Sequence, residues 1–387
     1  MRSFKMIWLS LKKDIHFLWN LKGIVFFGGY PYAERLSDGY FQRTQMVDRL
    51  FTDRWRVYVE GEYRAGQSHW FDRPEENVLV LRIAGQPFRR LLGQVCAILC
   101  ILRCRRIYFH SIFTMLHRRT GWLLSIPGII KVFDMHGAVT EEYRLHQDFF
   151  RAMLYEPVER LAIRKCDVIV VVTRAMENYL RQKYRDDVRG RIVLFPMFPD
   201  SPLAAAARPD INGKPVVVYA GGLQKWQQVP QMVNAVRHTH SLYEYRFYCP
   251  EPAKIRDMLP EEICSRVVIE HKTREELLAV YPDCHYGFIL REDTIVNQVA
   301  CPTKLVEYLA MGIVPIVNSE NIGDFQAMGM QSVSLEALLL GSLPDEERRA
   351  EMVRLNFEVY ERLRKIYQAG SNQIRTLLAD NSPPINN

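Results

Sequence analysis

The chain has 387 residues, of which 48% are hydrophobic and 25% charged, a globular balance that excludes disorder over most of its length. One core seldom grows this large, so we expect two domains of about 150 to 200 residues. The net charge of +7 is unevenly distributed along the chain. Residues 1–200 hold 32 Lys and Arg against 21 Asp and Glu (net +11), and residues 201–387 hold 19 Lys and Arg against 23 Asp and Glu (net −4). A basic N-terminal half favours an acidic partner, such as an anionic membrane surface, a phosphorylated acceptor or nucleic acid.

The eight cysteines form no Cys-x-x-Cys pair and no disulfide-like spacing, which predicts, with the lack of a cleavable signal sequence, a reducing cytoplasm. Cys96, Cys100 and Cys104 recur every four residues and indicate buried thiols on one helical face. No segment has the roughly 20 apolar residues of a membrane span. The apolar run 91–102, flanked by arginines, is either a core helix or a helix that lies on a membrane.

The first half of the chain alternates strands with helices. Residues 1–20 predict a basic, aromatic helix ahead of the first strand. Apolar runs predict strands at 22–27, 56–60, 78–82, 106–110, 129–134 and 166–172, with helices ending near 51, around 88–104, at 151–165 and at 175–183. Strand runs without polar alternation indicate a parallel sheet covered on both faces.

The pattern restarts after a linker. Five prolines around a four-alanine run predict that linker between residues 195 and 215. The strand 216–220 then runs into Gly221-Gly222, as the first strand runs into Gly28-Gly29. Further strands are predicted at 245–248, 267–270, 286–290 and 313–317, before a long charged helix from 346 and a frayed tail at 381–387.

The stretch 301–317 carries the strongest functional pattern. It predicts a loop, a short helix begun by Pro302, a left-handed stop at Gly312 and a strand. Lys304 and Glu307 share one face of that helix. A lysine beside the free N–H groups of a helix N-terminus suits a phosphate, and a glutamate one turn later suits ribose hydroxyls. A surface ion pair is the alternative.

The whole string, Pro-Thr-Lys-x-x-Glu-Tyr-x-Ala-x-Gly-x-x-Pro-x-Val, preceded by Arg291 and Asn297, resembles the donor-nucleotide motif of family 4 glycosyltransferases. The resemblance implies the GT-B fold: an α/β protein with two facing Rossmann-like domains, parallel sheets and a C-terminal helix that crosses back. We therefore expect an acceptor domain at 1–205, a nucleotide-sugar domain at 206–345, and the crossing helix and tail at 346–387.

The resemblance also implies roles for single residues. Glu307 would bind the ribose, and Arg291 and Lys304 the leaving diphosphate. His136, oriented by Asp134, would contact the donor sugar. The other predicted donor-binding residues are Gly221, Gly222, Lys225, Asn297 and Thr303. The predicted acceptor-side residues are Gly28, Gly29, Asp38, Arg43 and Glu141, with Glu142 as the alternative to Glu141.

Two positions depart from the family pattern. Val299 stands where the family often has a second glutamate, and Gly222 stands where it commonly has an arginine. Arg291 could replace that arginine. We expect no metal and no cofactor, because the chain has no Asp-x-Asp triplet and no clustered metal ligands.

The expected function is that of a retaining, hexosyl-type glycosyltransferase that moves a sugar from a nucleotide-sugar donor to a hydroxyl of a glycan or lipid-linked acceptor. The expected place is the cytoplasm, on the inner face of the cell membrane, in surface-polysaccharide assembly and without a nucleic-acid partner. A sugar-nucleotide epimerase of the same fold and an inactive nucleotide- or glycan-binding subunit stay open. The glycine fingerprint of a dinucleotide oxidoreductase is missing. The sequence names no base, sugar, acceptor or oligomeric state.

Overall fold

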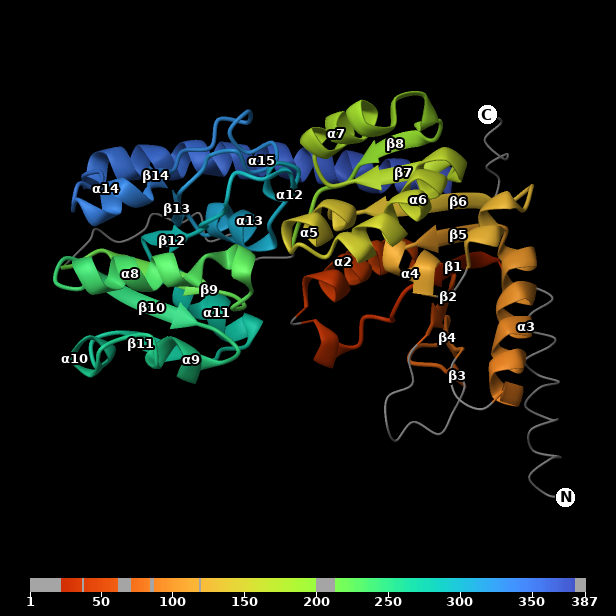
Figure 1. The fold of residues 1–387 in the computed structure, drawn as a ribbon, viewed down its shortest axis with the longest axis horizontal. Coiled ribbons are helices and arrows are strands. Elements are labelled where there is room, and N and C mark those ends of the chain that lie inside the picture. The colour runs from red at the N-terminus through yellow and green to blue at the C-terminus, as the bar shows by residue number, and fades with distance from the viewer. Residues whose placement is uncertain are drawn as a thin grey trace, which may run out of the picture. The chain divides into compact units, whose positions relative to one another are not determined.

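The computed structural model describes residues 22–36, 38–61, 71–83, 87–117, 120–199 and 213–379. The predicted helix at 1–20, the tail 381–387 and linker residues 200–212 lie outside these ranges. The chain divides into two units, each an α/β unit built on a parallel sheet (Figure 1). The described residues of unit 1 lie within Met1–Val171, Glu177–Phe195 and Ala369–Asn387, and those of unit 2 within Val172–Met176 and Pro196–Gln368.

Unit 1 contains an eight-stranded sheet in the order β3-β4-β2-β1-β5-β6-β7-β8. All neighbouring strands pair parallel except β3, which runs antiparallel to β4. The strands are β1 (Gly23–Phe27), β2 (Trp55–Glu60), β3 (Phe71–Asp72), β4 (Val78–Arg82), β5 (Arg106–Phe109), β6 (Ile130–Met135), β7 (Val168–Val171) and β8 (Arg191–Leu194).

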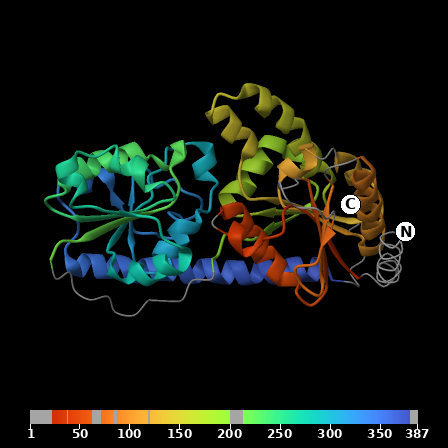
Figure 2. The same cartoon turned by 90° about the horizontal axis from the view of Figure 1, so that it is seen from below.

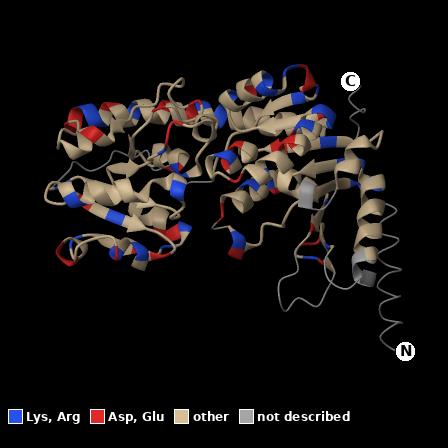
Figure 3. Ribbon diagram, viewed as in Figure 1, with Lys and Arg blue, Asp and Glu red and all other residues tan. Residues whose placement is uncertain are grey.

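The helices of unit 1 cover this sheet. They are η1 (Ala33–Arg35), α2 (Gly39–Asp48), η2 (Arg49–Phe51), α3 (Pro87–Cys104), α4 (Ile112–His117), η3 (Thr120–Ser125), α5 (Val139–Leu145), α6 (Phe149–Lys165), α7 (Arg174–Tyr184) and η4 (Arg185–Asp187). Cys100 and Cys104 are buried on α3, which packs against β1 and β4, whereas Cys96 is half-buried, so the prediction of buried thiols is confirmed for two of the three cysteines. The outer face of α3 is nonetheless apolar, and Figure 3 shows few charges along its described part.

Unit 2 contains a fully parallel six-stranded sheet in the order β11-β10-β9-β12-β13-β14. Its strands are β9 (Val216–Ala220), β10 (Glu244–Tyr248), β11 (Val268–Glu270), β12 (Tyr286–Phe288), β13 (Val314–Val317) and β14 (Val333–Ser334). Its helices are η5 (Lys225–Gln227), α8 (Val229–Thr239), α9 (Pro252–Arg256), α10 (Glu261–Cys264), α11 (Arg274–Val280), η6 (Tyr281–Asp283), α12 (Ile295–Gln298), α13 (Thr303–Ala310) and α14 (Leu335–Leu339).

The helix α15 (Glu346–Leu377) belongs to both units: it lies in unit 2 as far as Gln368 and in unit 1 from Ala369. Its unit 1 part packs closely on that unit, since a Cβ atom at Gly370 would lie 2.2 Å from the Leu194 carbonyl oxygen. Just beyond it, Arg54 donates to the Leu378 carbonyl at 3.0 Å.

Both sheets follow the strand order of a nucleotide-binding Rossmann fold, in which the chain reverses its direction of travel across the sheet after the third strand. In unit 2 the reversal lies between β9 and β12, and in unit 1 between β1 and β5. Ligands of such sheets bind outside the carboxyl ends of the strands at this switch point. The turn at Gly221-Gly222 follows β9 directly, and the turn at Gly28-Gly29 follows β1.

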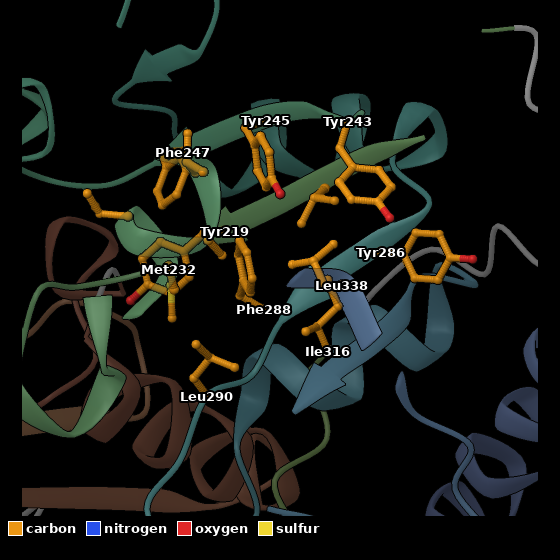
Figure 4. Close-up of a cluster of buried hydrophobic side chains, with 14 of the residues drawn as sticks. Tyr219, Met232, Tyr243, Tyr245, Phe247, Tyr286, Phe288, Leu290, Ile316 and Leu338 are labelled. Carbon is orange, nitrogen blue, oxygen red and sulfur yellow. The ribbon is translucent and has the colours of Figure 1, made fainter. Parts of the chain in front are cut away.

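An aromatic core fixes the elements around the unit 2 switch point (Figure 4). The rings of Tyr245 on β10 and Phe288 on β12 stack, with centroids 6.2 Å apart. On α13, Tyr308 is buried, and a Cβ at Gly287 would lie 2.3 Å from its ring. This glycine lets the Tyr308 hydroxyl reach the backbone N–H of Ala220, 3.3 Å away, so α13 is held against the end of β9.

The strand and helix predictions are confirmed within a few residues, and Gly312 takes the predicted left-handed conformation, with φ +65°. Pro302 is the N-cap of α13 and not its first helical residue. The sequence patterns did not reveal the edge strands β3, β8 and β14. Among the described residues, no helix is both long and apolar enough to cross a membrane.

Candidate functional site

The switch point of unit 2 brings together a group of predicted donor-site residues. The ammonium group of Lys304, on the first turn of α13, reaches the glycine turn after β9. Its Nζ atom lies 4.0 Å from the ring centroid of Tyr219 and donates to Gln227 Oε1 at 3.2 Å. The Tyr219 hydroxyl in turn donates to the Gly222 carbonyl. The helix of the motif and the glycine turn therefore form one site.

Gly221 makes this approach possible. Its φ of +154° is a conformation that residues with a side chain rarely adopt. A Cβ at this position would lie 2.6 Å from Lys304 Nζ and 2.9 Å from Lys304 Cε. The lysine thus occupies the space that a side chain at position 221 would fill.

Arg291, three residues past the end of β12, is the second cation of the site. Its backbone N–H donates to Asn318 Oδ1 at 2.6 Å, which fixes the loop. Within the described residues its guanidinium forms no hydrogen bond and no ion pair. Burial lowers the pKa of Arg291. Burial, and then the charge of Arg291, lower the pKa of Lys304 well below its ordinary value.

Glu307 does not form the predicted alternative, an ion pair with Lys304 on the helix surface. Arg274, at the start of α11, donates from Nε to Glu307 Oε1 at 3.2 Å. Burial raises the pKa of Glu307, while Arg274 and Lys304 oppose that rise. The Glu307 side chain is 12% exposed, so a small part of it is accessible. The site therefore holds three cations, Lys304, Arg291 and Arg274, against one acid.

The remaining donor-side predictions have other places. Asn297 is buried and donates from Nδ2 to the Glu292 carbonyl at 2.9 Å, so it braces the loop after β12, and its donor contact stays a prediction. Lys225 is exposed in η5, where Gln227 is the residue that contacts Lys304. Thr303 is the half-buried first residue of α13. The φ of Gly222 is not left-handed, and the three atoms nearest to a Cβ there belong to the exposed Gln224 side chain.

The switch point of unit 1 centres on a buried ion pair. Arg43 donates from Nε and Nη2 to the two Asp134 oxygens, both at 2.9 Å, and from Nη1 to the Phe195 carbonyl at 2.7 Å. The Tyr108 hydroxyl donates to Asp134 Oδ2 at 2.8 Å. Arg43 and Asp134 are fully buried. We therefore assign Arg43 a structural role in place of the predicted acceptor contact, since its guanidinium cannot reach a ligand.

His136 follows β6 as predicted, but Asp134 does not orient it through a hydrogen bond. Its Nδ1 lies 4.0 Å from Asp134 Oδ1 and has no hydrogen-bond partner among the described residues. Burial lowers the pKa of His136, which the charge of Asp134 opposes. Asp38 caps α2 by accepting from the Tyr40 N–H at 2.8 Å. His136 therefore stands beside the ion pair as a neutral, partly exposed imidazole.

The Gly28-Gly29 turn makes room for rings. A Cβ at Gly28 would lie 2.7 Å from the Tyr40 hydroxyl and 2.8 Å from His110 Cδ2, and one at Gly29 would lie 2.7 Å from the Phe41 ring. No sequence motif marks His110 as a site residue, although it follows β5 as His136 follows β6. It is fully buried between aromatic rings, and neither ring nitrogen has a partner within the described part of the chain.

Glu141 is also a structural residue. It accepts hydrogen bonds from Arg144 at 2.7 Å, and from Tyr179 and Lys183 of α7 at 2.7 and 3.0 Å. Burial alone would raise its pKa, but these donors lower it to about 2. Glu141 therefore links α5 to α7, and its acceptor contact stays a prediction. Glu142, the alternative, has a pKa raised by burial.

In the described residues, no three His, Cys, Asp or Glu side chains are grouped so that they could hold a metal ion. The expectation of a metal-free reaction remains a prediction.

Comparison with known proteins identifies the fold. No protein-family model and no curated protein sequence matches the chain. Among solved structures it resembles sucrose-phosphate synthase from Thermosynechococcus elongatus, with 15% identity and a TM-score of 0.63 over 92% of this chain and 98% of that one. It also resembles Anabaena Alr3699/HepE in complex with UDP-glucose, with 13% identity and a TM-score of 0.64 over 92% and 99%. A third similar structure is the E. coli trehalose-6-phosphate protein bound with UDP-2-fluoro glucose, with 11% identity and a TM-score of 0.60 over 93% and 99%. The chain has the GT-B fold of these glycosyltransferases.

Proposed function

We propose that the chain is a nucleotide-sugar-dependent glycosyltransferase that moves a glycosyl group to a hydroxyl of a glycan or lipid-linked acceptor, with retention of configuration. The observation that carries the proposal is the pair of cations at the unit 2 switch point. Burial lowers the pKa values of both Lys304 and Arg291, the charge of Arg291 lowers that of Lys304 further, and no acid among the described residues pairs with either. A diphosphate, with about two negative charges, would relieve this repulsion.

The same cations suit the chemistry. Charge builds on the departing diphosphate as the bond to the sugar breaks, and fixed cations lower the energy of that transition state without reorganisation. Glu307, whose side chain is 12% exposed, would accept hydrogen bonds from ribose hydroxyls. Because the leaving group has these protein cations, we propose a metal-independent reaction. The similar structures are described with UDP-glucose and UDP-2-fluoro glucose, so UDP-sugars are the first donors to test.

Binding of UDP, measured by calorimetry, tests the donor site. Lys304→Gln should weaken binding about 10- to 100-fold, the value of one charge-assisted hydrogen bond. Lys254→Gln, which removes an exposed lysine paired with Glu251, is the matched control and should bind UDP like the wild type. Equal affinity of all three proteins would remove Lys304 from the donor site.

Product analysis separates the enzyme classes that share this fold. A glycosyltransferase consumes a UDP-sugar only with an acceptor present, whereas an epimerase converts it without one. A nucleotide-binding subunit without activity would bind UDP and turn over no donor under either condition. The anomeric configuration of a transferred sugar, read by NMR spectroscopy, tests retention. His136→Ala should abolish turnover while UDP binding persists, and undiminished turnover would refute a role for His136 at the sugar.

A further inference from the structure

The helix α6 has apolar side chains on both of its faces. Ala152, Tyr155 and Ala162 are buried toward unit 1. Its opposite face exposes Phe149 (66%), Phe150 (67%) and Met153 (62%), and continues through Leu154 and Leu161. These residues, with Trp122 of η3 (55% exposed), are called the aromatic patch. Helices that are apolar all round are normally buried, and soluble monomers rarely expose large apolar patches without a function.

The aromatic patch rests on an ordered support. Asp148 caps α6 by accepting from the Arg151 N–H at 3.0 Å. Beneath the patch, the Tyr155 ring stacks on Tyr143 at 5.2 Å and meets Phe113 edge-on at 5.3 Å. The segment η3 lies against the other end of α6, since a Cβ at Gly121 would lie 3.8 Å from Leu161 Cδ2. Figure 2 shows the olive segment of unit 1 that contains α6 at the surface of that unit. The exposed rings are thus a built surface and not a frayed helix end.

The charges on α6 differ in exposure. Of its two acidic side chains, Glu159 is buried and accepts from Thr140 at 2.8 Å and Lys183 at 3.1 Å, whereas Glu156 is 35% exposed and its charge is paired with Arg144 at 2.8 Å. Its exposed charged residues are all basic: Arg151, Arg160, Arg164 and Lys165.

Two acids outside α6 partly offset these cations. Asp148 lies 3.4 Å from Arg151, and Asp187 lies 3.7 Å from Arg160 and 4.0 Å from Arg164. Four cations against two acids leave a positive rim around the apolar residues.

We propose that the aromatic patch docks this protein on an anionic lipid surface, with Phe149, Phe150 and Met153 entering the boundary between headgroups and acyl chains. An apolar helix face with aromatic residues and a basic border is the chemistry that such a surface selects. The 17 residues of α6 extend about 25 Å, so the helix can lie in the interface. The proposal deepens the proposed function, since it brings a lipid-linked acceptor to the enzyme, but its test does not depend on glycosyl transfer.

Flotation with vesicles of phosphatidylcholine, or of phosphatidylcholine and phosphatidylglycerol in equal amounts, tests the proposal. The wild type should float with the mixed vesicles and lose at least about tenfold in partitioning when the salt concentration is high. The variant Phe149→Ser/Phe150→Ser/Met153→Ser should lose about tenfold or more at low salt. Leu242→Ser/Leu340→Ser, which removes exposed leucines of unit 2, is the matched control and should float like the wild type.

UDP binding and the thermal unfolding midpoint establish that the variants are folded. The proposal is overturned if the variant of the aromatic patch still floats like the wild type. It is also overturned if flotation is lost only in the variant Leu91→Ser/Val95→Ser/Leu99→Ser, which changes the exposed face of α3. Sedimentation tests whether a second copy of this chain covers the aromatic patch instead of a lipid surface. If the wild type is a dimer, and the patch variant is a monomer that floats as well as the wild type, the proposal is also overturned. If UDP does not bind but flotation still depends on the aromatic patch, the proposed function is wrong and the proposal of lipid docking is supported.

Discussion

Replacing Gly221 by alanine tests whether the glycine turn after β9 acts through Lys304. The added methyl group would lie 2.6 Å from Lys304 Nζ, a separation that a real contact cannot keep, so the lysine must move. The Tyr219 hydroxyl, 3.3 Å away, leaves little room on the other side. We therefore expect the ammonium group to leave the place where it would meet a diphosphate.

Gly221→Ala should lower both the stability of the fold and the affinity for UDP, for different reasons. Alanine at φ +154° is strained, which costs about 1–3 kcal/mol of folding free energy. Loss of the lysine contact costs about 1.5–3 kcal/mol of binding free energy, which corresponds to roughly 10- to 150-fold weaker UDP binding. The first cost should appear in the free energy of unfolding and the second in the dissociation constant.

Calorimetry with UDP and urea unfolding measure the two costs separately. Gly329→Ala is the matched control, because Gly329 also has a positive φ, +88°, but nothing lies within 4 Å of the added methyl group. It should lose stability and keep its UDP affinity. If Gly221 acts through Lys304, the double variant Gly221→Ala/Lys304→Met should bind no more weakly than Lys304→Met alone. Unchanged affinity in Gly221→Ala, or fully additive losses in the double variant, would refute the reasoning.

Three further predictions concern charge. The pKa of Lys304 is lowered in the free protein, and a bound diphosphate raises it. Lys304 is a cation with and without UDP at a pH below the free-protein pKa; as the pH rises through that pKa, UDP affinity falls and binding takes up a proton. Calorimetry at such a pH, in buffers of different ionisation enthalpy, should detect an uptake that Lys304→Met abolishes. Gly222→Arg supplies the arginine common in the family and should fold, since the atoms nearest to the added Cβ belong to the flexible Gln224 side chain. It should bind UDP several-fold more tightly, and weaker binding would show that Arg291 already fills this role. Burial lowers the pKa of His110 from 6.5 to about 3, so at acidic pH the unfolded chain binds a proton that the folded chain does not. The free energy of unfolding therefore falls as the pH drops below 6.5, and the loss at pH 5 is about 2 kcal/mol. Urea unfolding should show this loss in the wild type and not in His110→Phe.

Local patterns were enough to predict most of the fold. Apolar runs marked the buried strands because parallel strands are covered on both faces, and the motif at 301–317 showed where α13 begins and ends. The sequence did not reveal the edge strands β3 and β14, because a strand of two residues is too short to show a hydrophobic pattern. The short motif at 301–317 predicted the GT-B fold by resemblance, and the strand orders of both sheets agree with that fold.

The candidate site was predicted only in part. The switch-point rule placed Gly221 and Arg291 beside the motif helix correctly, because each follows a strand that ends there. The partners that decide each side chain's state are far away in sequence: Arg274 lies 33 residues before Glu307, and Arg43 lies 91 residues before Asp134. No spacing rule links such residues, so a fully buried arginine was assigned to an acceptor surface.

The path of α15 has a consequence for the order in which the chain is made. Unit 1 is built from residues on both sides of unit 2, because Ala369 and the residues after it pack with the first unit and Gly370 meets the Leu194 carbonyl. A ribosome that synthesises from the N-terminus therefore releases all of unit 2 before the last helical turns of unit 1 exist. Until then the surface that these turns cover stays open to other proteins. We expect nascent chains stalled before residue 369 to expose it to chaperones and proteases.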